Sequence, residues 1–261
     1  MNKLKVILRS RQTKEYLQKA DIISVDYRDR RQIPDLIDNY RADIIVKIKY
    51  ADEDIDWKYL DAMNKMLATM GRELTVCLSN LAEHAKKCED YELKFYYGFP
   101  VDSFFKLRAL KDAGVCAVRL APPLTHMMDQ VAAYGLDILA VPNVAYNDGL
   151  PRRDGVLGGW IRPEDLTDTY LEYIDMVEFE DCDNNKEQAL YRLYFEEKAW
   201  PGDLGMIISN LNYLGVNRMI PPDLAQKRAN CGQRCLTGSH CNICYRFLEL
   251  ANPDIYDYMR K

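Results

Sequence analysis

The sequence predicts an α/β protein: a (β/α)8 barrel of the TIM type with a C-terminal cysteine-rich metal-binding loop. Short apolar runs alternate with longer segments of helical periodicity, which is typical of βα units with a mainly parallel sheet. Eight apolar runs can be found, and each is followed by a helical segment. At 261 residues the chain also has a length at which α/β barrels form one domain. An open doubly wound sheet uses the same units, and periodicity does not exclude it.

The expected elements follow one another in a regular order. The strands are expected at Lys5–Leu8, Ile22–Asp26, Asp43–Ile48, Leu74–Leu78, Leu93–Tyr97, Cys116–Leu120, Ile138–Val141 and Met176–Phe179. The helices are expected at Thr13–Ala20, Ile33–Tyr40, Trp57–Met70, Leu81–Cys88, Ser103–Ala113, Thr125–Tyr134, Pro163–Tyr173 and Glu187–Trp200.

Glycine and proline mark several of these boundaries. Gly71, Gly114 and Gly135 each follow a helical segment, where a residue with positive φ commonly ends a helix. Pro34 and Pro163 lie in the first turn of a helix, where the missing N–H is tolerated. These signals support the predicted ends of the helices and so the order of strands and helices.

The chain is expected to form a barrel over residues 1–200, with a C-terminal extension over residues 201–261 packed on it. A long connection from Asn143 to Arg162 follows the seventh strand and carries several glycines. Long loops in compact domains are usually functional or mobile. In a barrel this loop would lie at the C-terminal mouth, where active sites are built, although a plain surface insertion would look the same.

Four cysteines lie in one short stretch with the spacing Cys231-x3-Cys235-x5-Cys241-x2-Cys244. Close-spaced thiols of this kind indicate a metal site, because two disulfides would need an oxidising compartment. Four thiolates suit either a [4Fe-4S] cluster or Zn²⁺, and the spacing does not decide between them. With His240, the order Cys-Cys-His-Cys also approximates a zinc knuckle, although its first gap is one residue longer than usual.

Composition limits the partners that this chain can have. A net charge of −5 and a pI near 5.4 argue against broad, non-specific nucleic-acid binding, but leave a small molecule or a specific RNA base possible. The first residues contain too short an apolar run for a signal peptide, and no window approaches the roughly 20 apolar residues of a membrane span. A cytoplasmic protein is therefore expected, while its oligomeric state is left open.

In a barrel, polar residues at the C-terminal ends of the strands are the candidates for an active site. These residues are Arg9, Asp26, Lys47, Lys49, Ser79, Tyr96, Tyr97, Arg119, Asn143, Glu178 and Glu180. Lys47 and Arg119 interrupt apolar strands, where a charge needs a partner or a ligand, and with Asn143 they are predicted to bind substrate.

Glu178 and Glu180 are two residues apart, so on a strand they share one face, and they are predicted to be the catalytic carboxylates. An internal salt-bridge network among Lys47, Arg119 and Glu178 would give the same sequence pattern. The residues alone leave both interpretations open.

The run Trp160-Ile161-Arg162-Pro163-Glu164-Asp165-Leu166, followed by Tyr173-Ile174-Asp175-Met176-Val177-Glu178-Phe179-Glu180, resembles a barrel segment of the peptidase U32 family. In that family an R-P-x-D-L helix start precedes a strand ending in a K-I-E-G-R-like motif. Glu180 matches the glutamate of this motif, but Glu178 replaces its lysine, and Asp181-Cys182 replace Gly-Arg. The resemblance covers about a third of the chain.

Several U32 members are iron–sulfur proteins that support oxygen-independent hydroxylation of RNA bases or quinone precursors. The resemblance therefore implies a cluster-bearing barrel and a hydroxylation or related modification reaction. Family cysteines are more widely spread than the tetrad here, so cluster ligation carries over in kind and not position by position. Cys182 lies nearest to a family cysteine.

Two classes of function follow. The first is a metal- or iron–sulfur-cluster-dependent barrel enzyme acting on a small molecule or an RNA base. The second is a non-enzymatic zinc-binding module, or a structural component, that contacts nucleic acid or protein through its cysteine-rich loop.

Overall fold

The structure, a computed structural model, describes residues 4–49, 54–120, 124, 127–144, 160–168, 170–199, 201–209, 221 and 223–224. Eight parallel strands form a closed barrel in chain order, and the eighth strand pairs with the first. The predicted (β/α)8 fold class is therefore confirmed.

The strands agree with the sequence prediction to within a few residues at each end. They are β1 Lys5–Arg9, β2 Ile22–Asp26, β3 Asp43–Ile48, β4 Leu74–Leu78, β5 Lys94–Val101, β6 Ala117–Leu120, β7 Asp137–Ala140 and β8 Met176–Glu178. The apolar runs that predicted them are buried because a parallel barrel strand is covered on both faces.

The helices follow the expected alternation. They are α1 Lys14–Leu17, α2 Ile33–Asn39, α3 Trp57–Ala68, α4 Leu81–Asp90, α5 Phe104–Asp112, α7 Met128–Ala132, α9 Pro163–Asp168, α10 Asn184–Tyr191 and α11 Leu204–Ile207. A 3-10 helix, η1 (Tyr27–Gln32), precedes α2, and a π-helix, η2 (Arg192–Glu197), continues α10. α1, α7 and α9 are shorter than predicted.

Side-chain caps fix the starts of several helices. Asp56, Asn80 and Ser103 each accept a hydrogen bond from the backbone N–H three residues later, at α3, α4 and α5. Such caps satisfy N–H groups that have no partner within the helix. Gly71, Gly114 and Gly135 have positive φ after helix ends, as predicted.

The centre of the barrel is filled by one inward-facing side chain from each strand. This interior cluster consists of Ile7, Ile22, Ile45, Cys77, Tyr96, Ala117, Leu139 and Met176. Because side chains alternate along a strand, residues two positions before or after a cluster member also face the interior. This alternation identifies the polar residues at both ends of the barrel.

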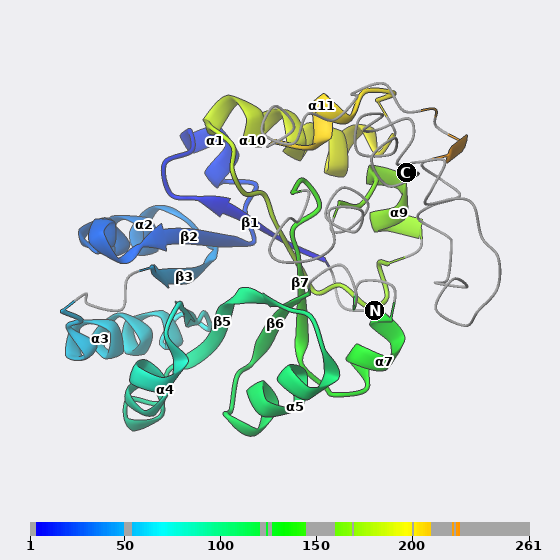
Figure 1. Ribbon diagram of the computed structural model, residues 1–261. Helices are drawn as coiled ribbons and strands as arrows, with labels where there is room; N and C mark the ends of the chain where they lie inside the picture. The colour runs from blue at the N-terminus through cyan, green and yellow to red at the C-terminus, as the bar shows by residue number, and fades with distance from the viewer. Residues whose placement is uncertain are drawn as a thin grey trace. The chain divides into compact units, whose positions relative to one another are not determined.

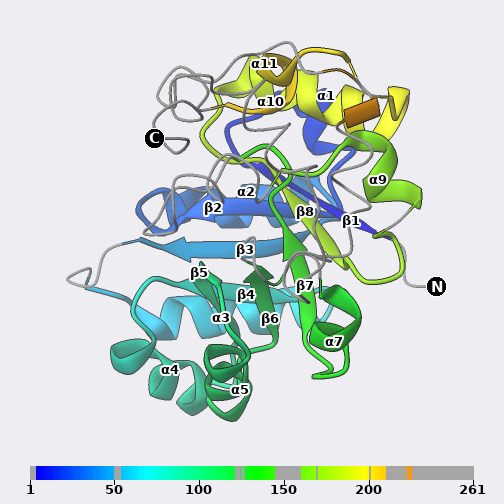
Figure 2. The same cartoon turned by 45° about the vertical axis from the view of Figure 1, so that its right-hand side comes forward.

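The chain divides into two compact units. The first consists of Met1–Arg119, Asp129–Ala140 and Ile174–Glu178 and contains nearly all of the barrel strands. Within it, α2, α3, α4 and α5 lie on the outer side of the strands (Figure 1). The turned view shows α3, α4 and α5 beside β3, β4 and β5 (Figure 2).

The second unit consists of Leu120–Met128, Val141–Tyr173 and Phe179–Lys261. An aromatic group holds part of it together: the Phe179 ring lies 5.5 Å from that of Tyr194 and 6.4 Å from that of Phe195. The prediction of a barrel over residues 1–200 and an extension over residues 201–261 stays a prediction. Among the described residues, no helix is long and apolar enough to cross a membrane.

Candidate functional site

Polar side chains form a layer inside the barrel at the C-terminal ends of the strands. By the alternation of strand side chains, its charged members on β1, β2, β3, β6 and β8 face inward, and Lys49 directly follows β3. They are Arg9, Asp26, Lys47, Lys49, Arg119 and Glu178. We call this set the C-terminal layer. It occupies the end of the barrel at which TIM-barrel active sites are built.

Lys47 and Glu178 form an ion pair across the barrel interior. The Nζ of Lys47 donates a hydrogen bond to Oε1 of Glu178, from β3 to β8. The Glu178 side chain is 2% exposed and that of Lys47 is 17% exposed, so the pair is largely shielded from water. A buried carboxylate is tolerated here because a cation lies beside it. The sequence predicted these two residues as a catalytic and a substrate-binding group, and the structure brings them together.

A second ion pair lies further toward solvent in the same layer. Lys49 contacts Asp26 at 3.0 Å, and both side chains are much more exposed than the buried pair. With Arg9 and Arg119, the layer holds four cations and two carboxylates. Its formal charge is therefore +2, although the whole chain is acidic.

Arg119 is the third residue of β6 and is partly buried. It lies two residues after Ala117, which belongs to the interior cluster, so it faces the same interior as Lys47 and Glu178. Its predicted part in substrate binding stays a prediction.

Asn143 and Glu180 belong to the second unit, where they contact each other. The buried Asn143 amide donates to the Glu180 carbonyl at 2.7 Å and to Ser209 Oγ at 2.8 Å, and it accepts from the Glu180 N–H at 3.0 Å. Both amide hydrogens of Asn143 are therefore used within the protein. Glu180 lies beyond the end of β8, so its predicted sharing of one strand face with Glu178 does not follow from strand geometry. The catalytic role of Glu180 stays a prediction.

The segment that resembles the U32 motif contains a buried ion pair. Nε of Arg162 donates to Asp165 Oδ2 at 2.6 Å, and both residues are almost fully buried at the start of α9. The hydroxyl of the buried Tyr194 donates to the carbonyl of Ile161, and this burial raises the pKa of Tyr194 well above its usual value. The arginine and aspartate of R-P-x-D-L thus hold the helix start in place.

The predicted metal ligands Cys231, Cys235, Cys241 and Cys244, with His240, lie outside the described residues. The loop over residues 145–159 also lies outside them. Within the described ranges, no group of three or more His, Cys, Asp or Glu side chains could hold a metal ion. Among the described residues, Cys77, Cys88, Cys116 and Cys182 form no disulfide with one another. The tetrad therefore stays a prediction from the sequence.

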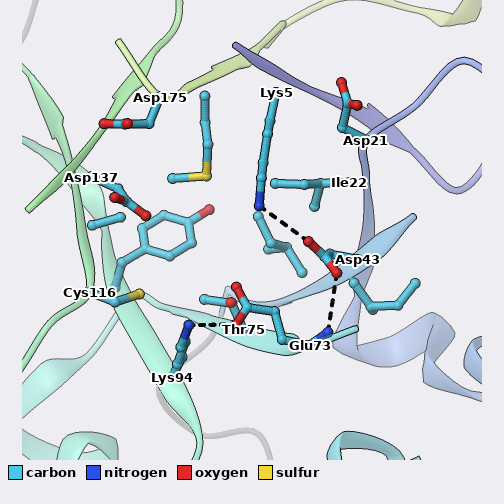
Figure 3. A pocket seen from close by; sticks show the side chains of 15 residues that line it. Lys5, Asp21, Ile22, Asp43, Glu73, Thr75, Lys94, Cys116, Asp137 and Asp175 are labelled. Carbon is cyan, nitrogen blue, oxygen red and sulfur yellow. Dashed lines mark hydrogen bonds and ion pairs between the residues drawn. The ribbon is translucent and has the colours of Figure 1, made fainter. Parts of the chain in front are cut away.

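A cavity of about 410 Å³ opens at the opposite end of the barrel, where the strands begin (Figure 3). Ile22, Ile45, Tyr96, Ala117 and Met176 of the interior cluster form its apolar part. Its charged residues are Lys5, Asp21, Asp43, Glu73, Lys94, Asp137 and Asp175. Five carboxylates and two lysines give this lining a formal charge of −3. We call it the N-terminal cavity.

Most carboxylates of the N-terminal cavity hold the beginnings of strands. Asp21 accepts the N–H of Val6 at 3.1 Å, Asp43 that of Glu73 at 3.2 Å, and Asp175 that of Ile138 at 2.8 Å. Lys5 contacts Asp43 at 3.4 Å, and Lys94 pairs with Glu73, as Figure 3 shows. These contacts give the lining a structural role, which is usual at the N-terminal face of such barrels.

Cys116 and Asp137 of this cavity have raised pKa values. Burial raises the pKa of the Cys116 thiol to about 11, and the carboxylate of Asp137 contributes to the shift. Burial also raises the pKa of Asp137, and neighbouring Asp175 raises it further. A thiol with a raised pKa is a poor nucleophile, so Cys116 is not placed for covalent chemistry at neutral pH.

The sequence prediction overlooked the N-terminal cavity, because only the C-terminal ends of the strands were searched. The signal was nevertheless present. Lys5, Asp43, Thr75, Lys94 and Asp137 each lie two residues before a member of the interior cluster and so face the interior. Polar residues at this position in five strands predict a polar layer at the N-terminal end.

No protein-family model matches this chain, and no curated protein matches it significantly. Solved structures with similar folds include 3-keto-L-gulonate-6-phosphate decarboxylase from Vibrio cholerae, at 13% identity and a TM-score of 0.41, covering 77% of this chain and 100% of that chain. Orotidine 5'-phosphate decarboxylase from Pyrococcus horikoshii matches at 12% identity and a TM-score of 0.37, covering 72% and 98%.

A designed cube-shaped protein cage, made by fusing symmetric oligomeric domains, matches at 15% identity and a TM-score of 0.41, covering 99% of this chain and 83% of that chain. Likenesses at this level do not assign an activity or a partner to this chain. The closed barrel and its charged C-terminal layer are the findings that bear on function.

Proposed function

We propose that this chain is a metal- or iron–sulfur-cluster-dependent barrel enzyme that modifies a small molecule or an RNA base. The observation that carries the proposal is the buried Glu178 carboxylate, held by Lys47 inside the C-terminal end of a closed barrel. Ionisable groups in such positions are frequently functional, because burying them is otherwise unfavourable.

Glu178 is the group for proton transfer in this proposal. Lys47 contacts Oε1 of this carboxylate. In this proposal Lys47 orients the carboxylate, and the carboxylate accepts the reacting proton. Lys47 changes its role from the sequence prediction: it positions Glu178, in addition to any contact with substrate.

Cys231, Cys235, Cys241 and Cys244 would hold the metal, for which we favour a [4Fe-4S] cluster over Zn²⁺. Their donor chemistry fits either group, since both are bound by four thiolates. A cluster would supply electron transfer for an oxidative modification such as hydroxylation, the reaction class implied by the U32 resemblance. Zn²⁺ would supply a structural site, and would favour the non-enzymatic alternative.

The test is the metal content of cysteine variants purified without oxygen. Cys235→Ser and Cys241→Ser are expected to lose the metal, because a serine oxygen replaces one of four thiolate ligands. Cys88→Ser is the matched control: Cys88 is buried in α4, and burial raises its pKa to about 12, so it should keep full metal content. Full stoichiometry in both tetrad variants would refute metal binding by the tetrad.

A further inference from the structure

Ser79 has a buried hydroxyl at the C-terminal end of the barrel that the sequence prediction did not assign to any task. It follows β4 and continues the ladder, since its N–H donates to the Ile48 carbonyl at 3.1 Å. It lies two residues after Cys77 of the interior cluster, so its side chain faces the barrel interior. Its Oγ is buried and has no hydrogen-bond partner among the described residues.

A buried hydroxyl without a partner is unfavourable, and native proteins contain few of them. Ser79 lies in the C-terminal layer beside Lys49, because the register pairs Ile48 with Leu78 immediately before them. That layer has a formal charge of +2. A donor hydroxyl beside a lysine is suited to an anionic oxygen.

The start of α4 adds to this preference. The helix begins at Leu81, two residues after Ser79, and runs for 10 residues. The N-terminus of a helix favours a negative charge through its unpaired N–H groups and its dipole. Asn80 caps Glu83 N–H, and its amide Nδ2 donates to the Glu83 carboxylate at 3.0 Å, so one exposed carboxylate shares this helix start.

The opposite end of the barrel would repel such a ligand. The charged lining of the N-terminal cavity has a formal charge of −3, against +2 for the C-terminal layer. The interior is therefore polarised along its axis, and an anion is directed to the end that carries Glu178.

We infer that the substrate of the proposed enzyme carries an oxyanion, a carboxylate or a phosphate, and that Ser79 Oγ donates a hydrogen bond to it in the C-terminal layer. This rests on the proposed function, since the same layer holds Glu178. It adds the charge class of the substrate and one specificity-determining residue.

The test is isothermal titration of the full-length, metal-containing protein with inorganic phosphate and, separately, with malonate. Both probes are doubly charged oxyanions at mildly alkaline pH, and the one that binds more tightly identifies the preferred oxyanion. Ser79→Ala should weaken that binding about tenfold or more, since a hydrogen bond to a charged group is lost. Arg119→Met, which lowers the formal charge of the layer to +1, should also weaken it.

Thr75→Val is the matched control. It removes a hydroxyl from the same face of β4, but at the N-terminal cavity, and should leave anion binding unchanged. Ser79→Ala should melt at the same temperature as the wild type or higher, because the lost hydroxyl has no partner to leave unpaired. A structural role for Ser79 would instead lower the melting temperature.

Failure to bind either anion, or equal binding by wild type and Ser79→Ala, would overturn the inference. Metal content, measured on the same samples, separates this outcome from failure of the proposed function. A protein that holds its cluster but binds no oxyanion refutes only the inference, whereas one that binds oxyanions without any metal refutes the proposed cofactor.

Discussion

At the scale of single residues, the Lys47–Glu178 pair shows that the C-terminal layer contains a structural ion pair, and the same two residues are the proposed site. The sequence predicted that both residues lie on strands and face inward, because side chains alternate between the two faces of a strand. It offered their contact as one of two interpretations and could not choose between them, because β3 and β8 lie far apart in the chain and meet only when the barrel closes. The predicted alternative of an internal salt bridge holds for this pair.

Lys47→Met should lower the free energy of unfolding by about 3–5 kcal/mol, because it leaves the buried Glu178 carboxylate without its cation. Adding Glu178→Gln should restore part of the loss, since the neutral side chain needs no counter-charge. Urea denaturation of the single and double variants measures both effects.

Lys49→Met is the control for Lys47→Met, because Lys49 directly follows the same strand. Its ion pair with Asp26 is exposed, so its removal should change stability by less than about 1 kcal/mol. Equal losses from Lys47→Met and Lys49→Met would show that burial does not set the strength of the inner pair.

Asp137→Asn should stabilise the protein at pH 7. Burial and Asp175 raise the pKa of Asp137 in the folded state, so the folded protein holds this proton more tightly than the unfolded chain does. Its contribution to stability is therefore present at low pH and is lost as the pH rises through the raised pKa. The gain from Asn should be at most about 1 kcal/mol and should vanish in acid, because Asp137 as a residue is exposed to solvent and only its carboxyl group is partly buried.

Asp102→Asn should have the opposite effect and lower the stability of the protein at pH 7. A hydrogen bond from Lys106 lowers the pKa of Asp102, so its contribution is present at neutral pH and is lost as the pH falls through the lowered pKa. Melting temperatures from pH 3 to pH 8 compare the two variants. If the stabilities of Asp137→Asn and Asp102→Asn changed with pH in the same way, the opposite pKa shifts of the two aspartates would be contradicted.

At the scale of elements, the sequence predicted every strand because each is a short apolar run that becomes buried on both faces. Helix lengths were less predictable. Thr125–Tyr134 was expected to be helical, but α7 covers Met128–Ala132 and gives way to a turn at Ala133 and Tyr134, because helical periodicity does not fix where a helix ends. The π-helix η2 lies inside the helix predicted at Glu187–Trp200, but its type was not predicted, and the 3-10 helix η1 was not predicted at all, because a helical run this short shows no clear period.

Gly98 of β5 lies so close to β4 that the contact between these strands leaves little room for a side chain. A Cβ at this position would lie 2.9 Å from Cys77 Sγ, inside the barrel. Gly98→Ala should therefore destabilise the protein by about 1–3 kcal/mol, the usual range for overpacking a core. Denaturation of Gly98→Ala alone and in a Cys77→Ala background measures the coupling.

In the Cys77→Ala background the Sγ atom is absent, so the added methyl has room. The double variant should be more stable than the sum of the two single losses predicts. Strict additivity would mean that the contact with Cys77 does not limit this position.

At the scale of the whole molecule, the sequence predicted the barrel and the end of it that carries the candidate site, because strand order alone brings the C-terminal ends together. It did not predict the charge difference between the C-terminal layer and the N-terminal cavity, because each of these sets contains residues from several strands. The cysteine tetrad was visible from spacing, but how it is arranged depends on residues beyond those described. The proposed cofactor therefore rests on chemistry more than on geometry.

The ultraviolet–visible spectrum of the protein purified without oxygen, with iron and zinc measured on the same sample, tests the central claim most directly. A cluster-dependent enzyme should be brown, with a broad band around 400 nm and stoichiometric iron. A colourless protein with stoichiometric zinc would keep the metal site but contradict the cluster. A colourless protein with neither metal would contradict the proposed function.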